Sequence, residues 1–133
     1  MDVQREHEKL ASARDAHIFD NVDEREILVL GEFEQLVLLA VLRLGDEAYG
    51  VPVLVEIERA TGRSPTVATV HTTLTRLEQK GLVTSRVGEP TPQRGGRRKR
   101  YFTVTPAGKR AVRDSLGAIR RLAQGLSVGW DTP

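Results

Sequence analysis

A run of cations follows closely on a polar-faced helical segment, and together they have the chemistry of a polyanion-binding site. Five of the seven residues from Arg94 to Arg100 are cationic. Guanidinium and ammonium groups bind phosphate oxygens whatever the base sequence. Gly95 and Gly96 allow a tight turn and a close approach of the backbone. The residues expected to hold phosphates are Arg94, Arg97, Arg98, Lys99 and Arg100.

The segment before this run predicts an amphipathic helix with an unusual polar face. Val67, Val70, Leu74 and Leu77 recur at i, i+3, i+7 and i+10, which forms one apolar stripe, and Gly81 ends the helix. The opposite face carries Thr rather than the better helix formers Glu and Lys. A Thr hydroxyl can donate or accept, and its methyl can contact thymine. The residues expected to face bases and phosphates are Thr66, Ala68, Thr69, His71, Thr72 and Arg76.

Three further segments must position these groups. Residues 31–44 predict a central helix that is buried on several sides, and residues 50–61 predict a second helix that precedes the Thr-faced one. Alternating apolar and polar residues at 82–87 and 101–105 predict two strands with the basic run between them. The expected fold is mainly α with a small β-hairpin: a winged helix-turn-helix with the third helix in the major groove.

The last helix is expected to join two copies of the chain. Thr105 and Pro106 form a strong helix start, as N-cap and first helical residue. Apolar residues then recur at near-heptad spacing, which suits helix–helix association in a twofold dimer; folding back onto its own domain is the alternative. The residues expected to build the core and the dimer seam are Leu36, Leu39, Val112, Leu116, Ile119, Ala123 and Leu126.

These elements divide the 133-residue chain into four parts. Residues 1–29 form an acidic, weakly patterned extension that is helical or frayed, and residues 30–105 form the winged domain. Residues 106–126 form the dimerisation helix, and residues 127–133 form a tail. Charge follows the same division: residues 1–60 carry six Lys/Arg against fourteen Asp/Glu, whereas residues 61–133 carry fourteen against four. A basic half is expected to face a polyanion.

Composition argues against several other classes. The chain has no cysteine, which excludes disulfides and thiol-held metals and favours a cytoplasmic location. Its longest apolar run, Leu36–Leu42, is far below the roughly 20 residues that cross a bilayer, so no membrane partner is expected. The three histidines are scattered, and HExxH, GxSxG, GxxxxGK[ST] and GxGxxG are all missing. We expect no catalytic residue, metal or cofactor.

In combination, the segments LEQKGLV, GEPTPQRGGRRKRYF and TPAG resemble the PadR-like transcriptional regulators, and the resemblance covers Leu30 to Leu122. It implies a winged-helix repressor that acts as a homodimer through its C-terminal helix. Some members of the family sense phenolic acids or hydrophobic drugs between subunits, which makes a small aromatic effector a candidate partner. This chain departs from the pattern where His71 follows Val70, since family members often place Tyr there.

Two alternatives remain open at this point. The chain could be a protein-interaction module that kept the winged fold and lost DNA binding, with its acidic N-terminal half suited to a basic partner. It could also act mainly as an effector sensor, with Trp130 stacking on an aromatic compound rather than serving as a hydrophobic plug. Retention of DNA in a mobility shift, or quenching of Trp130 fluorescence, would separate these functions.

Overall fold

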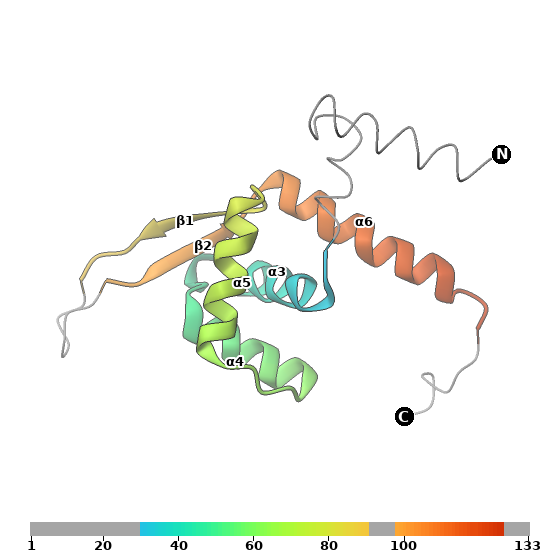
Figure 1. The fold of residues 1–133 in the computed structure, drawn as a ribbon, viewed down its shortest axis with the longest axis horizontal. Helices are drawn as coiled ribbons and strands as arrows, with labels where there is room; N and C mark the ends of the chain where they lie inside the picture. The colour runs from blue at the N-terminus through green and yellow to red at the C-terminus, as the bar shows by residue number, and fades with distance from the viewer. Residues whose placement is uncertain (1–29, 91–97, 127–133) are drawn as a thin grey trace, which may run out of the picture.

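The computed structural model of the chain describes residues 30–90 and 98–126. The predictions for Arg94, Arg97, Trp130 and residues 1–29 therefore lie outside the described residues. Three helices form a compact body, a two-stranded hairpin projects from one side, and a long helix leaves on the other (Figure 1). In chain order the elements are α3 (Glu32–Leu44), the 3₁₀ turn η1 (Gly45–Glu47), α4 (Gly50–Thr61), α5 (Val67–Gln79), β1 (Val83–Val87), β2 (Arg100–Val104) and α6 (Pro106–Ala123).

Helix α3 is the centre of the body, as its apolar composition predicts. Its first turn is closed by Glu34, whose Oε1 accepts a hydrogen bond from the Gly31 amide at 3.0 Å. Val37 and Leu38 are completely buried, and α3 contacts α4, α5, α6 and β2. Gly45 ends the helix with φ 61°, a left-handed conformation that glycine adopts without steric cost.

Helices α4 and α5 form the predicted helix-turn-helix. Pro52 lies in the first turn of α4, where its missing N–H costs no helical hydrogen bond, and Gly62 caps the helix at φ 75°. Val53 and Ile57 of α4 are buried, whereas Ala60 in its last turn is exposed. The inner stripe of α5 is shorter than expected, because Val67 is 38% exposed at the helix start.

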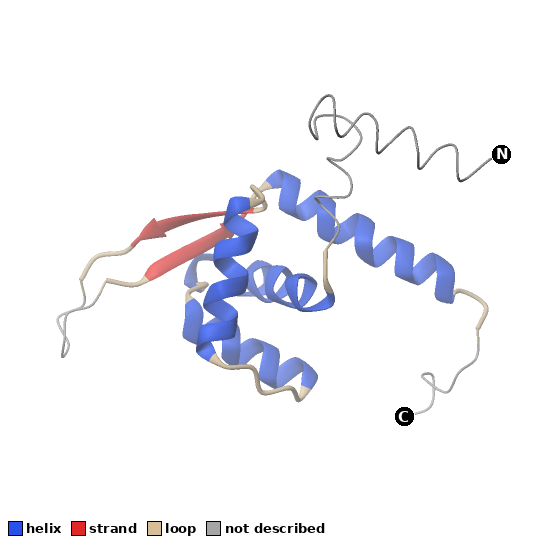
Figure 2. Cartoon of the chain, viewed as in Figure 1, coloured by secondary structure: helices blue, strands red, loops and turns tan. Residues whose placement is uncertain are grey.

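The hairpin is the wing of the fold, and its strands lie within one residue of the predicted ranges. β1 and β2 run antiparallel, with Val83 opposite Val104 and Val87 opposite Arg100. The amide of Phe102 donates to the carbonyl of Ala48 at 2.8 Å, which attaches the wing to the segment between α3 and α4. Figure 2 shows the hairpin as the sole sheet within the described ranges.

Helix α6 begins as predicted. The Thr105 hydroxyl accepts from the Gly108 amide at 3.0 Å and donates to the Gly81 carbonyl at 2.8 Å, and Pro106 follows it in the first turn. The first half of α6 packs on α3 and β2, whereas its C-terminal half runs out beyond the body (Figure 1). Of the helices that the structure describes, none has the length and apolar character needed to cross a membrane.

The residues expected at a dimer seam divide into three groups. Val112 is 4% exposed and belongs to the core of a single chain, so it supplies the core part of this set. Leu36 and Leu116 are half-buried against the same core. Leu39, Ile119 and Leu126 are exposed and Ala123 is half-exposed. The sequence stripe therefore begins in the core and ends on the surface.

Candidate nucleic-acid interface

The outer face of α5 carries the predicted set of small polar residues. Ala68, Thr69, Thr72 and Arg76 are all exposed, and Val70, Leu74 and Leu77 on the opposite face are fully buried. A shallow hollow, open to solvent, runs along this face and is lined by His71, Thr72, Thr75, Arg76 and Gln79. Sequence reasoning left Gln79 out of the site, although its position three residues after Arg76 places it on the same face.

Thr66 has a structural role at the start of this helix. Its hydroxyl accepts from the Thr69 amide at 3.0 Å and lies 2.8 Å from the Thr69 hydroxyl. The first of these contacts satisfies an amide that has no partner within the helix. The second fixes the side chain of Thr69 on the exposed face. Thr66 therefore contributes to the polar face of α5 partly by holding the side chain of Thr69 in place.

His71 lies against the first residue of α4. A Cβ placed on Gly50 would be 2.8 Å from Nε2 of His71, so a larger residue at this position would require the imidazole to move. Gly50 is buried although it begins a helix, because the imidazole covers it. The sequence indicated Gly50 only as the start of a helix. Nothing in the residues around Gly50 or His71 predicted this contact between α4 and α5.

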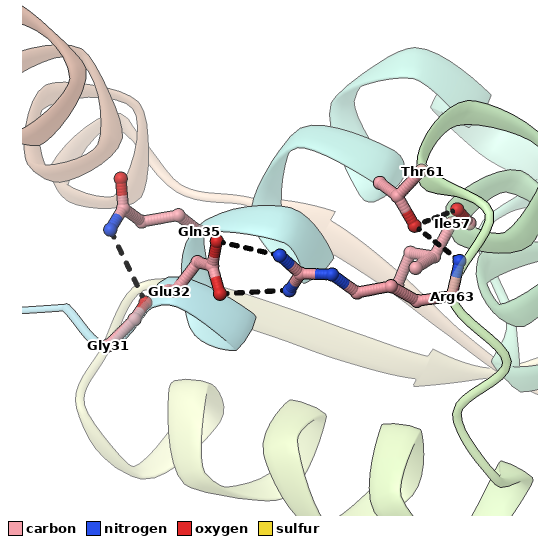
Figure 3. A network of polar contacts seen from close by, with 6 residues as sticks. All are labelled: Gly31, Glu32, Gln35, Ile57, Thr61 and Arg63. Atoms are coloured by element: carbon pink, nitrogen blue, oxygen red, sulfur yellow. Dashed lines mark hydrogen bonds and ion pairs between the residues drawn. The ribbon is translucent and has the colours of Figure 1, made fainter.

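The turn that leads into α5 is tied to the start of α3 (Figure 3). The guanidinium of Arg63 donates to both carboxylate oxygens of Glu32, at 2.8 and 3.0 Å. These hydrogen bonds, together with the charge of Arg63, lower the pKa of Glu32. The backbone of the same turn is held by Thr61, whose hydroxyl accepts from the Arg63 amide at 3.1 Å and donates to the Ile57 carbonyl at 2.7 Å. The start of α5 is thereby positioned relative to α3 and α4.

A second ion pair ties the other end of α5 to α3. Nζ of Lys80 lies 3.0 and 2.8 Å from the two carboxylate oxygens of Glu34, which is buried. Burial by itself raises the pKa of Glu34, but the hydrogen bonds from Lys80 and the Gly31 amide and the charges of Lys80 and Arg76 outweigh it, so the pKa is lowered. The helix that carries the polar face is thus anchored at both ends.

The described cations of the wing differ in their surroundings. Arg98 and Arg100 are exposed, and Nη1 of Arg100 donates to the Ser85 hydroxyl at 2.9 Å across the hairpin. Lys99 is half-buried instead. Its Nζ lies 4.5 Å from the ring centre of Tyr49 and donates to the Tyr49 hydroxyl at 3.3 Å. The phosphate role expected of Lys99 therefore competes with an internal contact.

Arg86 adds a cation that sequence reasoning did not assign to the site. It is exposed on β1, and its guanidinium carbon lies 4.5 Å from the ring centre of Tyr101. Alternation along β1 placed Arg86 on the outer face of the strand, which was the available signal. Over residues 30–90 and 98–126 the structure brings together no group of three or more His, Asp or Glu side chains that could hold a metal ion.

Three packed helices, the third of which has an exposed polar face, and a two-stranded wing define a winged helix-turn-helix fold. Residues 38–114, more than half of the chain, match the transcriptional regulator PadR-like family. The chain belongs to this family. A search of curated protein sequences gave no match.

Solved structures agree with this assignment of the fold. A PadR family transcription regulator from Clostridium difficile R20291 is 22% identical, with 71% of this chain and 93% of that chain covered and a TM-score of 0.57. A PadR family transcriptional regulator from Eggerthella lenta DSM 2243 is 21% identical, with 91% and 92% covered and a TM-score of 0.54. The Aeropyrum pernix ORC1 protein, solved in complex with DNA, is 25% identical; 90% of this chain aligns with 32% of that one at a TM-score of 0.57.

Proposed function

We propose that this chain is a transcriptional repressor that binds double-stranded DNA as a homodimer. The observation that carries the proposal is the outer face of α5. That face is exposed along its length and carries small hydroxyl side chains, one imidazole and one guanidinium around an open hollow. Both ends of the helix are anchored to α3, so the face is presented by a rigid element.

The side chains on this face suit a DNA groove. Small residues such as Ala68, Thr69 and Thr72 let the helix backbone approach base edges closely, and their hydroxyl and methyl groups can read those edges. Arg76 and Gln79, one turn further on, can donate to guanine, adenine or phosphate. A helix of this width fits the major groove, which is the placement expected for the second helix of a helix-turn-helix.

The wing supplies the affinity that does not depend on sequence. Arg86, Arg98 and Arg100 are exposed on the hairpin, which projects beyond the end of the helical body. Cations in this position contact phosphates beside the groove that α5 occupies, and each phosphate contact releases counterions. Arg94 and Arg97, within the same basic run, would add to this charge. The DNA complex of the similar Aeropyrum pernix protein supports the assignment of this fold to duplex binding.

The exposed half of α6 supports the dimer. Ile119 is 56% exposed, Leu122 is 84% exposed and Leu126 is 57% exposed, all near the end of the helix that extends away from the body. A second copy related by a twofold axis would cover these side chains and remove their apolar surface from water. Two copies would place two α5 helices on one face of DNA, which predicts a pseudo-palindromic operator with half-sites about one helical turn apart.

Selection of duplexes from a random-sequence pool, followed by a mobility shift, tests this function. The full chain is expected to enrich a two-half-site sequence and to bind it more tightly than a scrambled duplex of the same length. A reporter gene placed behind the selected sequence should fall in expression when the chain is present. Equal binding to every duplex would leave the sequence-reading role of α5 without support. Complete loss of DNA binding, with retention of a protein partner, would favour the interaction-module alternative.

A further inference from the structure

Two consecutive residues at the start of α4 contact both parts of the proposed DNA-binding surface. The side chain of Tyr49 meets the wing, where its ring lies 5.4 Å from the ring of Tyr101 at an interplanar angle of 61°. This edge-to-face arrangement is favourable for aromatic pairs. On the other side, Gly50 is the bare surface against which the imidazole of His71 in α5 rests.

Tyr101 on the wing has further contacts besides the one with Tyr49. The guanidinium of Arg86 lies over the Tyr101 ring at 4.5 Å, and a Cβ on Gly88 would be 2.8 Å from Cε1 of the same ring. The ammonium of Lys99 lies over the Tyr49 ring at 4.5 Å. Two aromatic rings and two cations thus form one contiguous cluster, which we call the aromatic joint: Tyr49, Arg86, Lys99 and Tyr101.

We infer that Tyr49 is a positioning residue that sets the orientation of the wing relative to α5, and that Lys99 acts through Tyr49 rather than on phosphate. The inference rests on the proposed DNA-binding function. The base of the wing is held by the hydrogen bond from Phe102 to Ala48, by the burial of Val83 and Val104 in the core, and by the Ser85 hydroxyl, which donates to Glu78 of α5 at 2.7 Å. The aromatic joint adds a side-chain contact between the wing and the start of α4, and this contact further restricts movement of the hairpin relative to the helical body.

The assignment of Lys99 has a physical reason. A cation over a tyrosine face is attracted by the negative charge of the ring, and the Lys99 ammonium also donates to the Tyr49 hydroxyl at 3.3 Å. Lys99 is half-buried, whereas its neighbours Arg98 and Arg100 are exposed. Lys99 immediately precedes β2, and its contact with Tyr49 accounts for its partial burial. Phosphate affinity then belongs to the two arginines.

Salt-dependent binding separates the two roles, with the selected duplex and its scrambled counterpart as probes. Tyr49→Ala is expected to lower the affinity ratio between the two duplexes by about tenfold, the size of one lost base contact. Tyr49→Phe keeps the ring and should stay close to wild type. Lys99→Met, which keeps the aliphatic stem, should lower the ratio and leave the slope of log affinity against log salt unchanged. The matched control Arg98→Ala should reduce that slope by about one for each lost phosphate contact.

A measurement without DNA keeps the inference separate from the proposed function. The chain has no cysteine, so Thr75→Cys on α5 and Glu89→Cys beside the wing accept a unique pair of spin labels. In labelled chains diluted with unlabelled ones, Tyr49→Ala or Lys99→Met should broaden the distribution of distances between the two spin labels.

A wild-type distance distribution in both variants would overturn the inference. A salt slope for Lys99→Met that falls as it does for Arg98→Ala would also overturn it. Loss of all DNA binding by the wild type would instead refute the proposed function. If Tyr49→Ala does not fold, Lys99→Met decides both measurements.

Discussion

Gly108 in the first turn of α6 lies directly against the backbone of Leu82. A Cβ built on Gly108 would be 2.1 Å from the carbonyl oxygen of Leu82 and 2.7 Å from Cγ1 of Val104. The Leu82 carbonyl cannot easily move away, because it accepts a hydrogen bond from the Thr105 amide at 3.0 Å. The glycine of the TPAG segment is therefore required by the approach of α6 to the base of the wing.

Replacement of Gly108 by Ala should destabilise the fold by about 1–3 kcal/mol, because the added methyl must push apart backbone that is already hydrogen-bonded. Gly117→Ala in the same helix is the matched control. A Cβ there would meet only the flexible end of Arg121, at 3.3 Å. The control should gain up to about 1 kcal/mol from better helix propensity. Denaturant unfolding at one protein concentration measures both, and equal effects of the two substitutions would contradict the packing argument.

Local sequence signals predicted much of this fold. Gly45 and Gly62 mark real helix ends, and Thr105 caps α6 as its position before Pro106 indicates. Each of these signals depends on a neighbour a few residues away. The orientation of Lys99 depends on Tyr49, fifty residues earlier, and the burial of Gly50 depends on His71. Contacts between distant segments leave no periodic trace in one sequence.

The same limit explains what the helical stripes missed. Periodicity gives the direction in which a side chain points, but not where the partner element ends. Val67 belongs to the apolar stripe of α5 and is still 38% exposed, because it is the first residue of the helix. The apolar stripe that follows Thr105 begins at Val112 inside the core and ends at exposed Leu126. The same spacing of apolar residues therefore covers both buried and exposed positions.

The Glu34–Lys80 ion pair should make the free energy of unfolding depend on pH in the acidic range. The folded pKa of Glu34 is lowered, so the pair contributes fully above the ordinary carboxyl value near 4.5 and is lost as pH falls through the lowered value. Glu34→Gln should cost about 1.5–3 kcal/mol at pH 7, the net contribution of a hydrogen bond to a charged group. The difference between variant and wild type should shrink as the pH is lowered from 5 to about 3.

Urea unfolding at several pH values measures this difference directly. Other carboxylates with lowered pKa values, such as Glu32 and Glu56, are present in both proteins and cancel from the comparison. Glu32→Gln is a useful second variant, since its pair with Arg63 is exposed and should contribute less. A stability difference for Glu34→Gln that stays constant from pH 7 to 3 would contradict the role of the ion pair.

Thr72 tests whether α5 reads bases. Thr72→Val keeps the branched shape and the methyl group and replaces the hydroxyl with a second methyl, so the fold should be unchanged. If the hydroxyl bonds a base edge, the affinity ratio between the selected and scrambled duplexes should fall about three- to tenfold. The salt slope should stay the same, because no phosphate contact is lost.

Thr103→Val is the control for this substitution. Thr103 is exposed on β2 opposite Thr84, near the base of the wing and away from the hollow on α5. Its affinity ratio should remain within about twofold of wild type, as for most surface substitutions. Equal ratios for the two variants in fluorescence anisotropy titrations would remove Thr72 from the reading surface.

The exposed apolar residues at the end of α6 predict which substitutions should weaken the dimer. Ile119→Glu and Leu122→Glu each place a carboxylate on the surface that a second copy would cover, and an unpaired buried charge is costly. Sedimentation equilibrium should show at least a tenfold weaker dimer, about 1.4 kcal/mol, for each variant. Val55→Glu is the matched control, since Val55 is 51% exposed on α4 and lies outside the proposed seam. The two α6 variants should also bind a duplex with two half-sites no more tightly than a duplex with one half-site. The tighter binding of two half-sites requires a dimer. If all three variants sediment as the wild type does, the seam lies elsewhere on the chain; if Val55→Glu alone dissociates the dimer, the interface is formed by α4 rather than α6.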